Sequence, residues 1–263
     1  MVDSKYIEDL RTKSQLGQLR EQSKLIKYSG LLFNELKQPI VTLHEITVSL
    51  DPDLRRAGYT FTDGCGRVSA DVARTLTAGM FPTPSVLQIR APGIKGILVM
   101  DPQLPKKSIR FRRSMQKLDL LNLSDTPLVK TIGVAVIGVS KPTHCTGLNS
   151  DPLRRLYLPI RDSRNLFGIC DEFSVLPAGK CYINVAASDG SFQTVTGKVA
   201  LWRNPCYHPG DIVLLEAVEN EKLSHLKNVI VFSVLGSRPA ADMCAGGDLD
   251  GDTFHVVWDN AIV

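Results

Sequence analysis

The stretch AGGDLDGDTFHVVWD, residues 245–259, decides how the rest of the chain is interpreted. It places three carboxylates at alternate positions: Asp248, Asp250 and Asp252. In an extended strand alternate side chains point to the same face, where three negative charges repel one another. A hard divalent cation offsets that repulsion, and a ligand set made only of oxygens suits Mg²⁺, Mn²⁺ or Ca²⁺. The stretch therefore predicts a metal site.

The residues around the carboxylates predict a loop at the end of a sheet. Gly246, Gly247 and Gly251 give the backbone the freedom to curl the carboxylates around one point. The apolar run 254–258 predicts a buried strand that would hold this loop. Divalent ions bound there would suit phosphoryl transfer, in which they activate an attacking oxygen and stabilise a leaving pyrophosphate.

Two other interpretations of the carboxylates stay open. One is a surface acidic turn that binds nothing. The other is a calcium loop, because the three aspartates match positions 1, 3 and 5 of an EF-hand and Asp259 matches position 12. Position 6 of that loop should be glycine and is Thr253 here, and the flanking pattern is typical of a strand.

Composition describes an ordinary globular protein. The chain has 263 residues, 43% of them hydrophobic and 22% charged, enough for one large domain or two of moderate size. The longest apolar stretch, 132–139, is too short to cross a bilayer, and the N-terminus has no apolar signal core, so no membrane association is expected. The six cysteines form no CxxC pair and predict reduced thiols in a cytosolic or nuclear protein.

Basic residues form a second group of candidates. Lys95 stands between glycines in GIKG, at the start of an apolar strand, while RRSMQK contributes Arg113 and Lys117. A lysine can contact a phosphate as a point charge, and an arginine can bind it through two hydrogen bonds. The nearby Lys106 and Lys107 are predicted to lie on a solvated charged face.

The segment NPCYHPGD, residues 204–211, lies between two predicted strands, and its prolines and glycine predict a shaped turn. Cys206 and His208 have no neighbours in sequence that would complete a tetrahedral metal site. Asp211 is expected to brace the turn. No strict internal repeat is visible along the chain.

Six blocks, in this order, carry a resemblance to a known family. They are YTFTDGCGRVS (59–69), PSVLQIRAPGIKGILVMDP (84–102), FRRSMQK (111–117), RNLFGICDEFSVLPAGKCYINV (164–185), GKVALWRNPCYHPGDIVLLEAV (197–218) and AGGDLDGDTFHVVWD (245–259). The blocks resemble those of the eukaryotic cellular RNA-dependent RNA polymerases of RNA silencing.

The resemblance implies a mainly β fold with some α: two double-psi β-barrels, as in the core of the multisubunit RNA polymerases, and an N-terminal helical segment. The implied boundaries are 1–40 for the helical segment, 41–145 for the first barrel, 146–165 for a shortened connector and 166–263 for the second barrel.

The resemblance also implies an activity, which is templated transfer of a nucleotide from an NTP to an RNA 3′-hydroxyl with release of pyrophosphate. Asp248, Asp250 and Asp252 would be the catalytic ligands of Mg²⁺ or Mn²⁺. Lys95 and Lys117, with Arg113 beside them, would contact nucleotide and RNA phosphates. Single-stranded RNA templates, NTPs and RNA-silencing factors would be the partners.

The chain departs from the family pattern in two places. It reaches RNLFG about a dozen residues after KPTHCTGLNSDP, where the family has a long connector, and it stops eleven residues after Asp252. A truncated RNA-binding remnant of the family, without catalysis, is therefore the alternative function.

Overall fold

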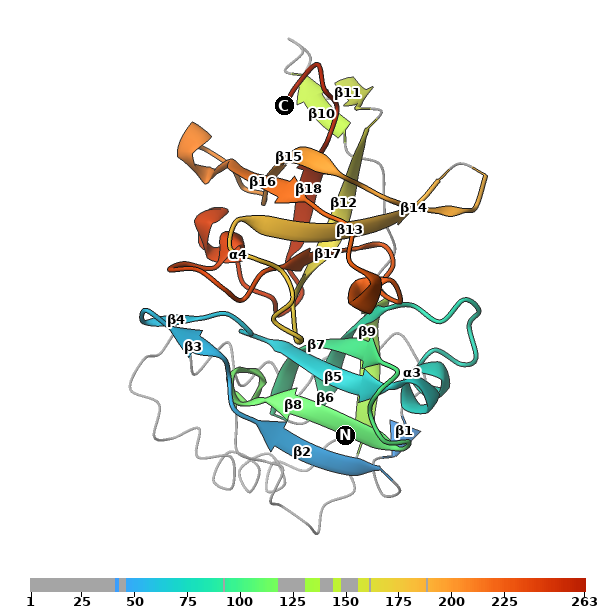
Figure 1. Ribbon diagram of the computed structural model, residues 1–263. Coiled ribbons are helices and arrows are strands. Elements are labelled where there is room, and N and C mark those ends of the chain that lie inside the picture. Colours follow the sequence, from blue (N-terminus) through green and yellow to red (C-terminus); the bar gives the residue numbers. More distant parts are fainter. Residues whose placement is uncertain are drawn as a thin grey trace, which may run out of the picture. The chain divides into compact units, whose positions relative to one another are not determined.

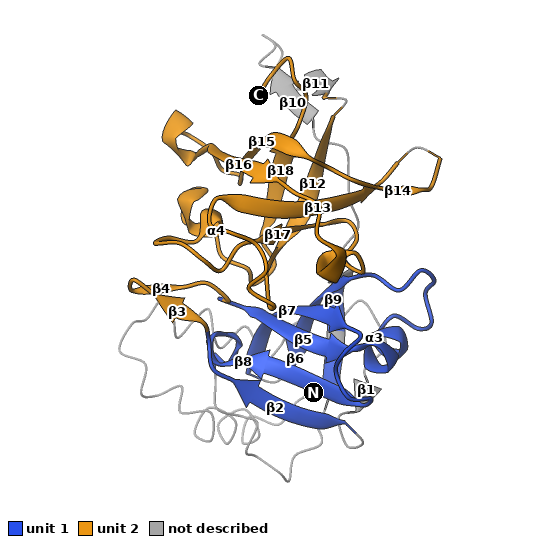
Figure 2. Ribbon diagram, viewed as in Figure 1, with its two compact units in different colours: residues 1–53, 63–137 blue, residues 54–62, 138–263 orange. Residues whose placement is uncertain are grey.

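The protein is mainly β and forms two compact units, coloured separately in Figure 2. Unit 1 comprises residues 1–53 and 63–137, and unit 2 comprises residues 54–62 and 138–263. The computed structural model describes residues 41–42, 46–91, 93–117, 131–137, 144–147, 156–160, 162–187 and 189–263. The helical segment predicted for residues 1–40 lies outside these ranges.

Unit 1 is built on one seven-stranded sheet in the order β1-β9-β6-β7-β5-β8-β2. Its strands are β1 (Val41–Thr42), β2 (Thr47–Asp51), β5 (Cys65–Ser69), β6 (Val86–Ala91), β7 (Ile94–Asp101), β8 (Ser108–Arg112) and β9 (Thr131–Ile137). The short helix α3 (Ala70–Leu76) follows β5 and buries Val72, Ala73 and Leu76 in the same core as the inner faces of the strands. The helix thus covers part of the sheet and completes the hydrophobic core of the unit (Figure 1).

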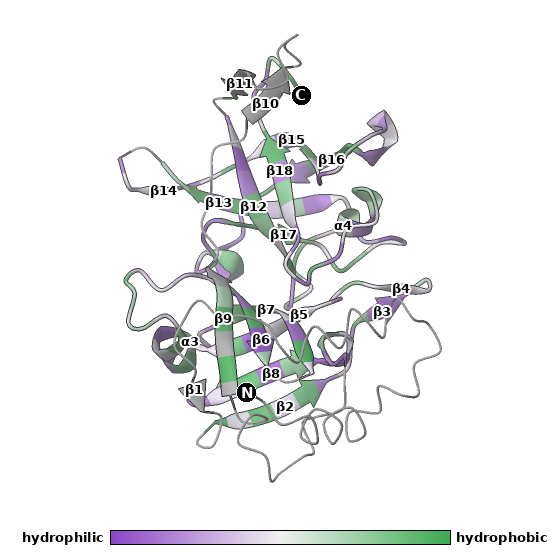
Figure 3. Ribbon diagram, turned by 180° about the vertical axis from the view of Figure 1, so that it is seen from behind, coloured by the Kyte–Doolittle hydropathy of each residue, from purple (hydrophilic) through white to green (hydrophobic). Residues whose placement is uncertain are grey.

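Unit 2 contains a closed ring of six strands. They follow one another around the ring as β12 (Ser163–Cys170), β17 (Val229–Phe232), β13 (Lys180–Ala186), β16 (Val213–Ala217), β15 (Gly197–Trp202) and β18 (Thr253–Val257), and β18 pairs with β12 again. The remaining strands of the unit are β3 (Arg55–Arg56), β4 (Tyr59–Thr60), β10 (His144–Gly147), β11 (Leu156–Pro159) and β14 (Phe192–Thr194). Hydrophobic residues lie mainly along the strands in both units, as Figure 3 shows.

The two units repeat one pattern of strand pairing. In unit 1, β2–β8 and β5–β7 are parallel, while β5–β8, β6–β7 and β6–β9 are antiparallel. In unit 2, β12–β17 and β13–β16 are parallel, while β13–β17, β15–β16 and β15–β18 are antiparallel. Each pairing of the first set has its counterpart in the second. This weave of parallel and antiparallel pairs is that of a double-psi β-barrel, and the predicted fold class is confirmed for the part of the chain that is described.

Glycines are required where the backbones of unit 1 come closest. A Cβ atom on Gly96 of β7 would lie 2.4 Å from the carbonyl oxygen of Gly64 and 2.9 Å from Cε of Met115. A Cβ atom on Gly66 of β5 would lie 2.6 Å from the carbonyl oxygen of Arg110. Real Cβ atoms do not approach backbone oxygens so closely, so only glycine fits at these positions.

Two side-chain hydrogen bonds fix the start of α3 and the turn after β15. Ser69 stands at the N-cap of α3, but its side chain caps none of the helix amides and instead accepts a hydrogen bond from the Ser108 N–H at 3.1 Å. In the turn 204–211, His208 rather than Asp211 accepts the bracing bond, from the Gly210 N–H to Nδ1 at 2.9 Å. Within the described ranges, no helix is long and apolar enough to cross a membrane.

Candidate functional site

The three aspartates lie on the loop that joins the short helix α4 (Ala240–Met243) to β18. We call residues 244–252 the aspartate loop. Ala245, Gly246 and Gly251 have positive φ angles of 52°, 65° and 132°, so the backbone curls sharply at both ends of the DLDGD run. Alternating carboxylates would suggest an extended strand, but the aspartates lie on a curled loop. The curvature comes from the glycines, whose backbone freedom predicted it.

The aspartate loop is held by its own carboxylates. The Asp250 N–H donates to Oδ1 of Asp248 at 3.0 Å, and the Asp248 N–H donates to Oδ2 of Asp252 at 3.0 Å. Leu249 is buried in the core, with 3% of its surface exposed, while all three aspartates are half-buried. The Asp252 carbonyl accepts a bond from the Gly168 N–H of β12 at 3.3 Å. The two bonds between aspartates fix the shape of the loop. The buried Leu249 and the bond from Gly168 fix the loop at the end of the ring.

The donor chemistry of the aspartate loop fits a hard divalent cation. Three carboxylates and no nitrogen or sulfur ligand form an oxygen-only set, which Mg²⁺ and Mn²⁺ prefer. Among the described residues, however, the three carboxylates do not form a group whose ligand oxygens all lie within 4.8 Å of one another. Like charges repel without a counterion, so a cation would have to draw the oxygens closer together.

The structure does not have the helices on both sides of the loop that an EF-hand calcium site requires. An EF-hand loop needs helices on both sides. Here Thr253, which would be position 6, begins β18, and the strand continues to Val257. The helix before the loop, α4, has only four residues.

A second segment, Trp202–Asn204 at the end of β15, contacts the aspartate loop and β18. Nη2 of Arg203 donates to the Ala245 carbonyl at 2.7 Å, and Nε donates to the Cys244 carbonyl at 3.4 Å. The same Nε lies 3.4 Å from Oδ2 of Asp252. The sequence interpretation missed Arg203, although it stands directly before NPCYHPGD, because the residues it contacts are about forty positions away.

The residues on either side of Arg203 hold His255 of β18. The His255 ring stacks on Trp202 with centroids 5.3 Å apart, and its Nε2 lies 3.0 Å from Nδ2 of Asn204. Burial lowers the pKa of His255 below its ordinary value of 6.5. The imidazole is thus kept neutral near pH 7, and it stands three residues after the last aspartate, Asp252.

This burial predicts a pH dependence of stability. The unfolded chain protonates His255 near pH 6.5, whereas the folded chain resists protonation. The free energy of unfolding therefore decreases as the pH falls below about 6.5, because the unfolded chain binds a proton that the folded chain does not. We expect the free energy of unfolding to fall less steeply over this range in His255→Gln than in the wild type. Denaturant titrations at a series of pH values measure this slope. Above about pH 7.5, where His255 is neutral in the folded and the unfolded chain, the slopes of the two proteins should coincide, which is the internal control.

The predicted basic residues of unit 1 lie at one corner of that unit. The Lys117 N–H donates to the Gly93 carbonyl at 2.7 Å, and Gln116 forms an isolated β-bridge with Ile94. These contacts place the backbone of Lys117 beside the start of β7, where Lys95 is the second residue. Nζ of Lys117 donates to the Ser114 carbonyl at 2.5 Å. We call Lys95, Arg113 and Lys117 the basic corner.

The 3-10 helix η4 (Arg113–Met115) shapes the basic corner. Oγ of Ser114 donates to Oδ1 of Asp53 at 2.6 Å and accepts a bond from the Gly64 N–H at 2.9 Å. Met115 is fully buried beneath this turn, whereas Arg113 is exposed. Arg113 is therefore exposed on a turn that is anchored on both sides, and Nζ of Lys117 bonds back to the same turn.

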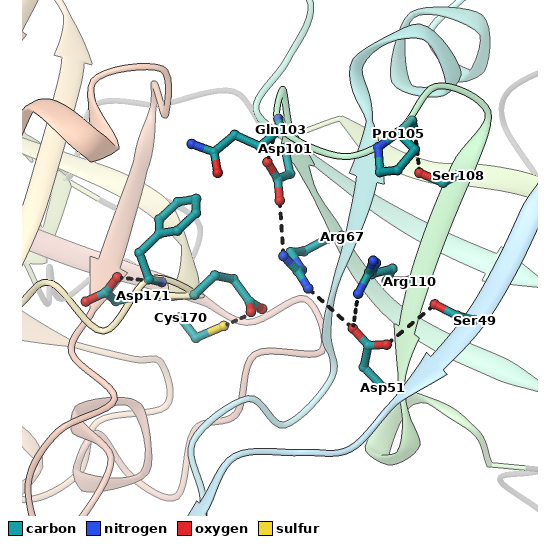
Figure 4. Close-up of polar contacts among 12 residues, drawn as sticks. Ser49, Asp51, Arg67, Asp101, Gln103, Pro105, Ser108, Arg110, Cys170 and Asp171 are labelled. Atoms are coloured by element: carbon teal, nitrogen blue, oxygen red, sulfur yellow. Dashed lines mark hydrogen bonds and ion pairs between the residues drawn. The ribbon is translucent and has the colours of Figure 1, made fainter.

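Other basic residues of unit 1 are neutralised by carboxylates (Figure 4). Arg67 lies 3.3 Å from Oδ2 of Asp51 and 3.2 Å from Oδ2 of Asp101, and Arg110 lies 3.6 Å from Oδ2 of Asp51. Lys106 is exposed, in agreement with a solvated face. Arg67 and Arg110 are thus paired with carboxylates inside unit 1.

Buried thiols and carboxylates of unit 2 have structural roles. Burial raises the pKa of the Cys181 and Cys244 thiols to about 12, so neither is a nucleophile near neutral pH. Asp171, labelled in Figure 4, is fully buried, and its carboxylate accepts bonds from the N–H groups of Phe173 at 3.1 Å and Leu176 at 2.7 Å. Burial raises the pKa of Asp171 as well, and its hydrogen bonds show that it shapes the turn after β12.

Comparisons with known proteins point in one direction. A family model described as RNA dependent RNA polymerase matches residues 4–156 and 150–263. The probable RNA-dependent RNA polymerase 2 of Oryza sativa subsp. japonica is 27% identical over 338 residues, which cover 93% of this chain and 30% of that protein. RNA-dependent RNA polymerase 1 of Arabidopsis thaliana is 27% identical over 325 residues, which cover 93% of this chain and 29% of that protein. The solved structure of the RNA dependent RNA polymerase QDE-1 from Thielavia terrestris matches with a TM-score of 0.82 and 22% identity, over 98% of this chain and 40% of that one.

The alignments also show how this chain differs from these proteins. It spans less than a third of the length of the two plant relatives. The rice alignment, at 338 residues, is longer than this chain, so the rice protein carries residues that this chain lacks. The two segments of the family match meet at residues 150–156, inside the stretch predicted as a shortened connector.

Proposed function

The chain belongs to the RNA-dependent RNA polymerase family, a family of RNA-directed nucleotidyltransferases, and we propose that it forms the catalytic core of such an enzyme. Its reaction would be the attack of an RNA 3′-hydroxyl on the α-phosphate of an NTP, directed by a single-stranded RNA template, with release of pyrophosphate. The observation that carries the proposal is the aspartate loop, which presents three carboxylates at the end of a closed ring of strands.

The proposed roles follow from the chemistry of each group. Asp248, Asp250 and Asp252 would hold Mg²⁺ or Mn²⁺. The bound ions would stabilise the charge on the phosphoryl oxygens and lower the pKa of the attacking hydroxyl. The curled backbone keeps the three carboxylates on one short loop, so little chain entropy is lost when they bind an ion. The basic corner of unit 1 would bind nucleotide or RNA phosphates through charge-assisted hydrogen bonds.

The biological setting is part of the same proposal. We assign the chain to RNA silencing, with RNA templates, NTPs and silencing factors as partners, in the cytoplasm or the nucleus. The names of the relatives support the polymerase chemistry. The setting rests on the resemblance of the sequence blocks to the silencing polymerases.

Templated incorporation tests the proposal directly. The chain is mixed with a primed single-stranded RNA, Mg²⁺ or Mn²⁺, and one labelled NTP at a time. Only the NTP complementary to the next template base should extend the primer, and changing that base should change the NTP that is used. Incorporation that ignores the template would contradict the proposal. RNA binding without any extension would instead support the non-catalytic remnant.

The basic corner leads to a separate prediction. Lys95→Ala and Lys117→Ala should each weaken use of NTP by about 10- to 100-fold in kcat/KM, the effect of losing a hydrogen bond to a charged group. Steady-state primer extension at varied NTP concentration measures the change. Lys106→Ala removes an exposed lysine from the same basic stretch and should leave kcat/KM unchanged. Equal effects of all three substitutions would show general charge attraction instead of specific contacts.

A further inference from the structure

The side chain of Arg203, directly after β15, contacts the aspartate loop. Its guanidinium donates to two consecutive carbonyls, those of Cys244 and Ala245, and its Nε lies 3.4 Å from the carboxylate of Asp252. It thereby joins the start of the aspartate loop to its end. A planar guanidinium suits this arrangement, because it presents several donors in a fixed fork.

The backbone of the aspartate loop also packs against Arg203. A Cβ atom on Gly247 would lie 3.1 Å from both Cδ and Nε of Arg203 and 2.7 Å from the Ala241 carbonyl oxygen. Gly247 itself is buried. The aliphatic part of Arg203 and the chain at Gly247 are therefore in close contact, and the loop cannot shift toward β15 while the arginine stays in place.

The corresponding turn of unit 1 makes a similar contact. The β6–β7 turn of unit 1 has the same place in the pairing pattern as the β15–β16 turn of unit 2. In unit 1 the Gly93 carbonyl of that turn accepts a hydrogen bond from the Lys117 N–H, in the segment that precedes β9. In unit 2 the turn uses an arginine to hold the segment that precedes β18. The contact between this turn and the segment before the last strand is thus a feature of both barrels.

We infer that Arg203 is a positioning residue for the aspartate loop: it fixes the loop in the shape that binds the divalent cation. This inference rests on the proposed function for its purpose, but the contacts that carry it belong to the metal-free protein. Arg203 acts through Asp252 and the loop backbone. The residues that follow it, Asn204–Cys206, belong to the turn, whereas Arg203 itself holds the aspartate loop.

Two measurements on the whole chain, without RNA or NTP, test the role. The first is amide hydrogen exchange of the metal-free protein, in which the amides of Asp248 and Asp250 are hydrogen-bonded within the loop. Arg203→Gln should speed exchange in peptides that cover 244–252 and leave those from β12 and β13 unchanged. The second is Mn²⁺ binding, followed by the electron paramagnetic resonance of the free ion, where the dissociation constant should rise about 10- to 100-fold.

Arg164→Gln is the matched control. Arg164 is also half-buried in unit 2 and also donates to two carbonyls, those of Ser163 at 2.7 Å and Ala186 at 3.2 Å. Its loss should change neither loop exchange nor Mn²⁺ binding. Arg203→Lys keeps the positive charge beside Asp252 without the fork, so it should recover only part of the wild-type behaviour.

The outcomes separate the possible roles. Unchanged exchange of 244–252 in Arg203→Gln overturns the inference, and so does Mn²⁺ binding that is equal or tighter, since a charge that only competed with the cation would give that result. Full recovery in Arg203→Lys also overturns it, because charge alone would then suffice. If the wild type binds no Mn²⁺, the metal site of the proposed function fails, and the exchange experiment still decides the role of Arg203.

Discussion

The Asp250→Asn variant is expected to lose at least about 1,000-fold of its rate of templated nucleotide incorporation, because metal-ligating charge contributes several kcal/mol to the stabilisation of a phosphoryl transition state. The substitution keeps the shape of the side chain and the backbone N–H that donates to Asp248. Only the charge and one ligand oxygen are lost. Single-nucleotide extension of a labelled primer, with a large excess of protein over primer, measures a rate this low.

A matched substitution elsewhere in unit 2 controls for charge. Asp189 is exposed in the loop between β13 and β14, where it accepts bonds only from Ser191 among the contacts described. Asp189→Asn changes the net charge equally and should extend the primer at the wild-type rate. If wild type and Asp250→Asn incorporate the same trace of label, catalysis by this chain is refuted.

The second large effect concerns stability. Gly96→Ala is expected to reduce the free energy of unfolding of unit 1 by about 3 kcal/mol, the upper part of the range for overpacking a core. The new methyl group would lie 2.4 Å from the Gly64 carbonyl oxygen and 2.9 Å from Cε of Met115. The Met115 side chain can move, but the Gly64 carbonyl accepts the Ile97 N–H at 2.9 Å and cannot move without breaking that bond.

Gly79→Ala gives the appropriate comparison, because it makes the same chemical change in the same unit. Gly79 has a φ of 76° with nothing within 4 Å of an added Cβ, so alanine there costs backbone strain alone, about 1 kcal/mol. Urea denaturation of both variants, followed by a probe in unit 1, compares the two costs. Equal losses would show that the close approach of Gly96 and Gly64 has no energetic consequence.

The sequence predicted much of unit 2 because its strands are nearly continuous apolar runs. The apolar run 254–258 predicted β18 to within one residue, and the two strands predicted on either side of residues 204–211 are β15 and β16. Among the strands that were not predicted, two have a visible reason. Charges obscure β8, whose sequence is SIRFR, and β12 begins with the polar residues SRN. In both strands the backbone pairing outweighs a weak hydrophobic pattern.

The repeated pairing pattern and the role of Arg203 could not have been predicted from local sequence. A double-psi barrel repeats the order of its pairings and not its residues, so the two units share no repeat that is visible along the chain. Arg203 contacts Ala245 across 42 positions, and no spacing rule connects an arginine with a carbonyl at that distance in the sequence. The aspartates were found because their charges are grouped within five residues.

The closure of the ring in unit 2 has a consequence for how the aspartates become functional during folding. The strand that closes the ring, β18, is the last strand of the chain, and it pairs with the first strand of the ring, β12. Contacts between residues so far apart in sequence form slowly, because a long stretch of chain loses entropy when they form. Until β18 is in place, the end of the loop at Asp252 is not held, and the carboxylates can move apart as they repel one another. Affinity for a divalent ion should therefore appear late in refolding, together with the final burial of Phe254, and its time course would report the last step of assembly.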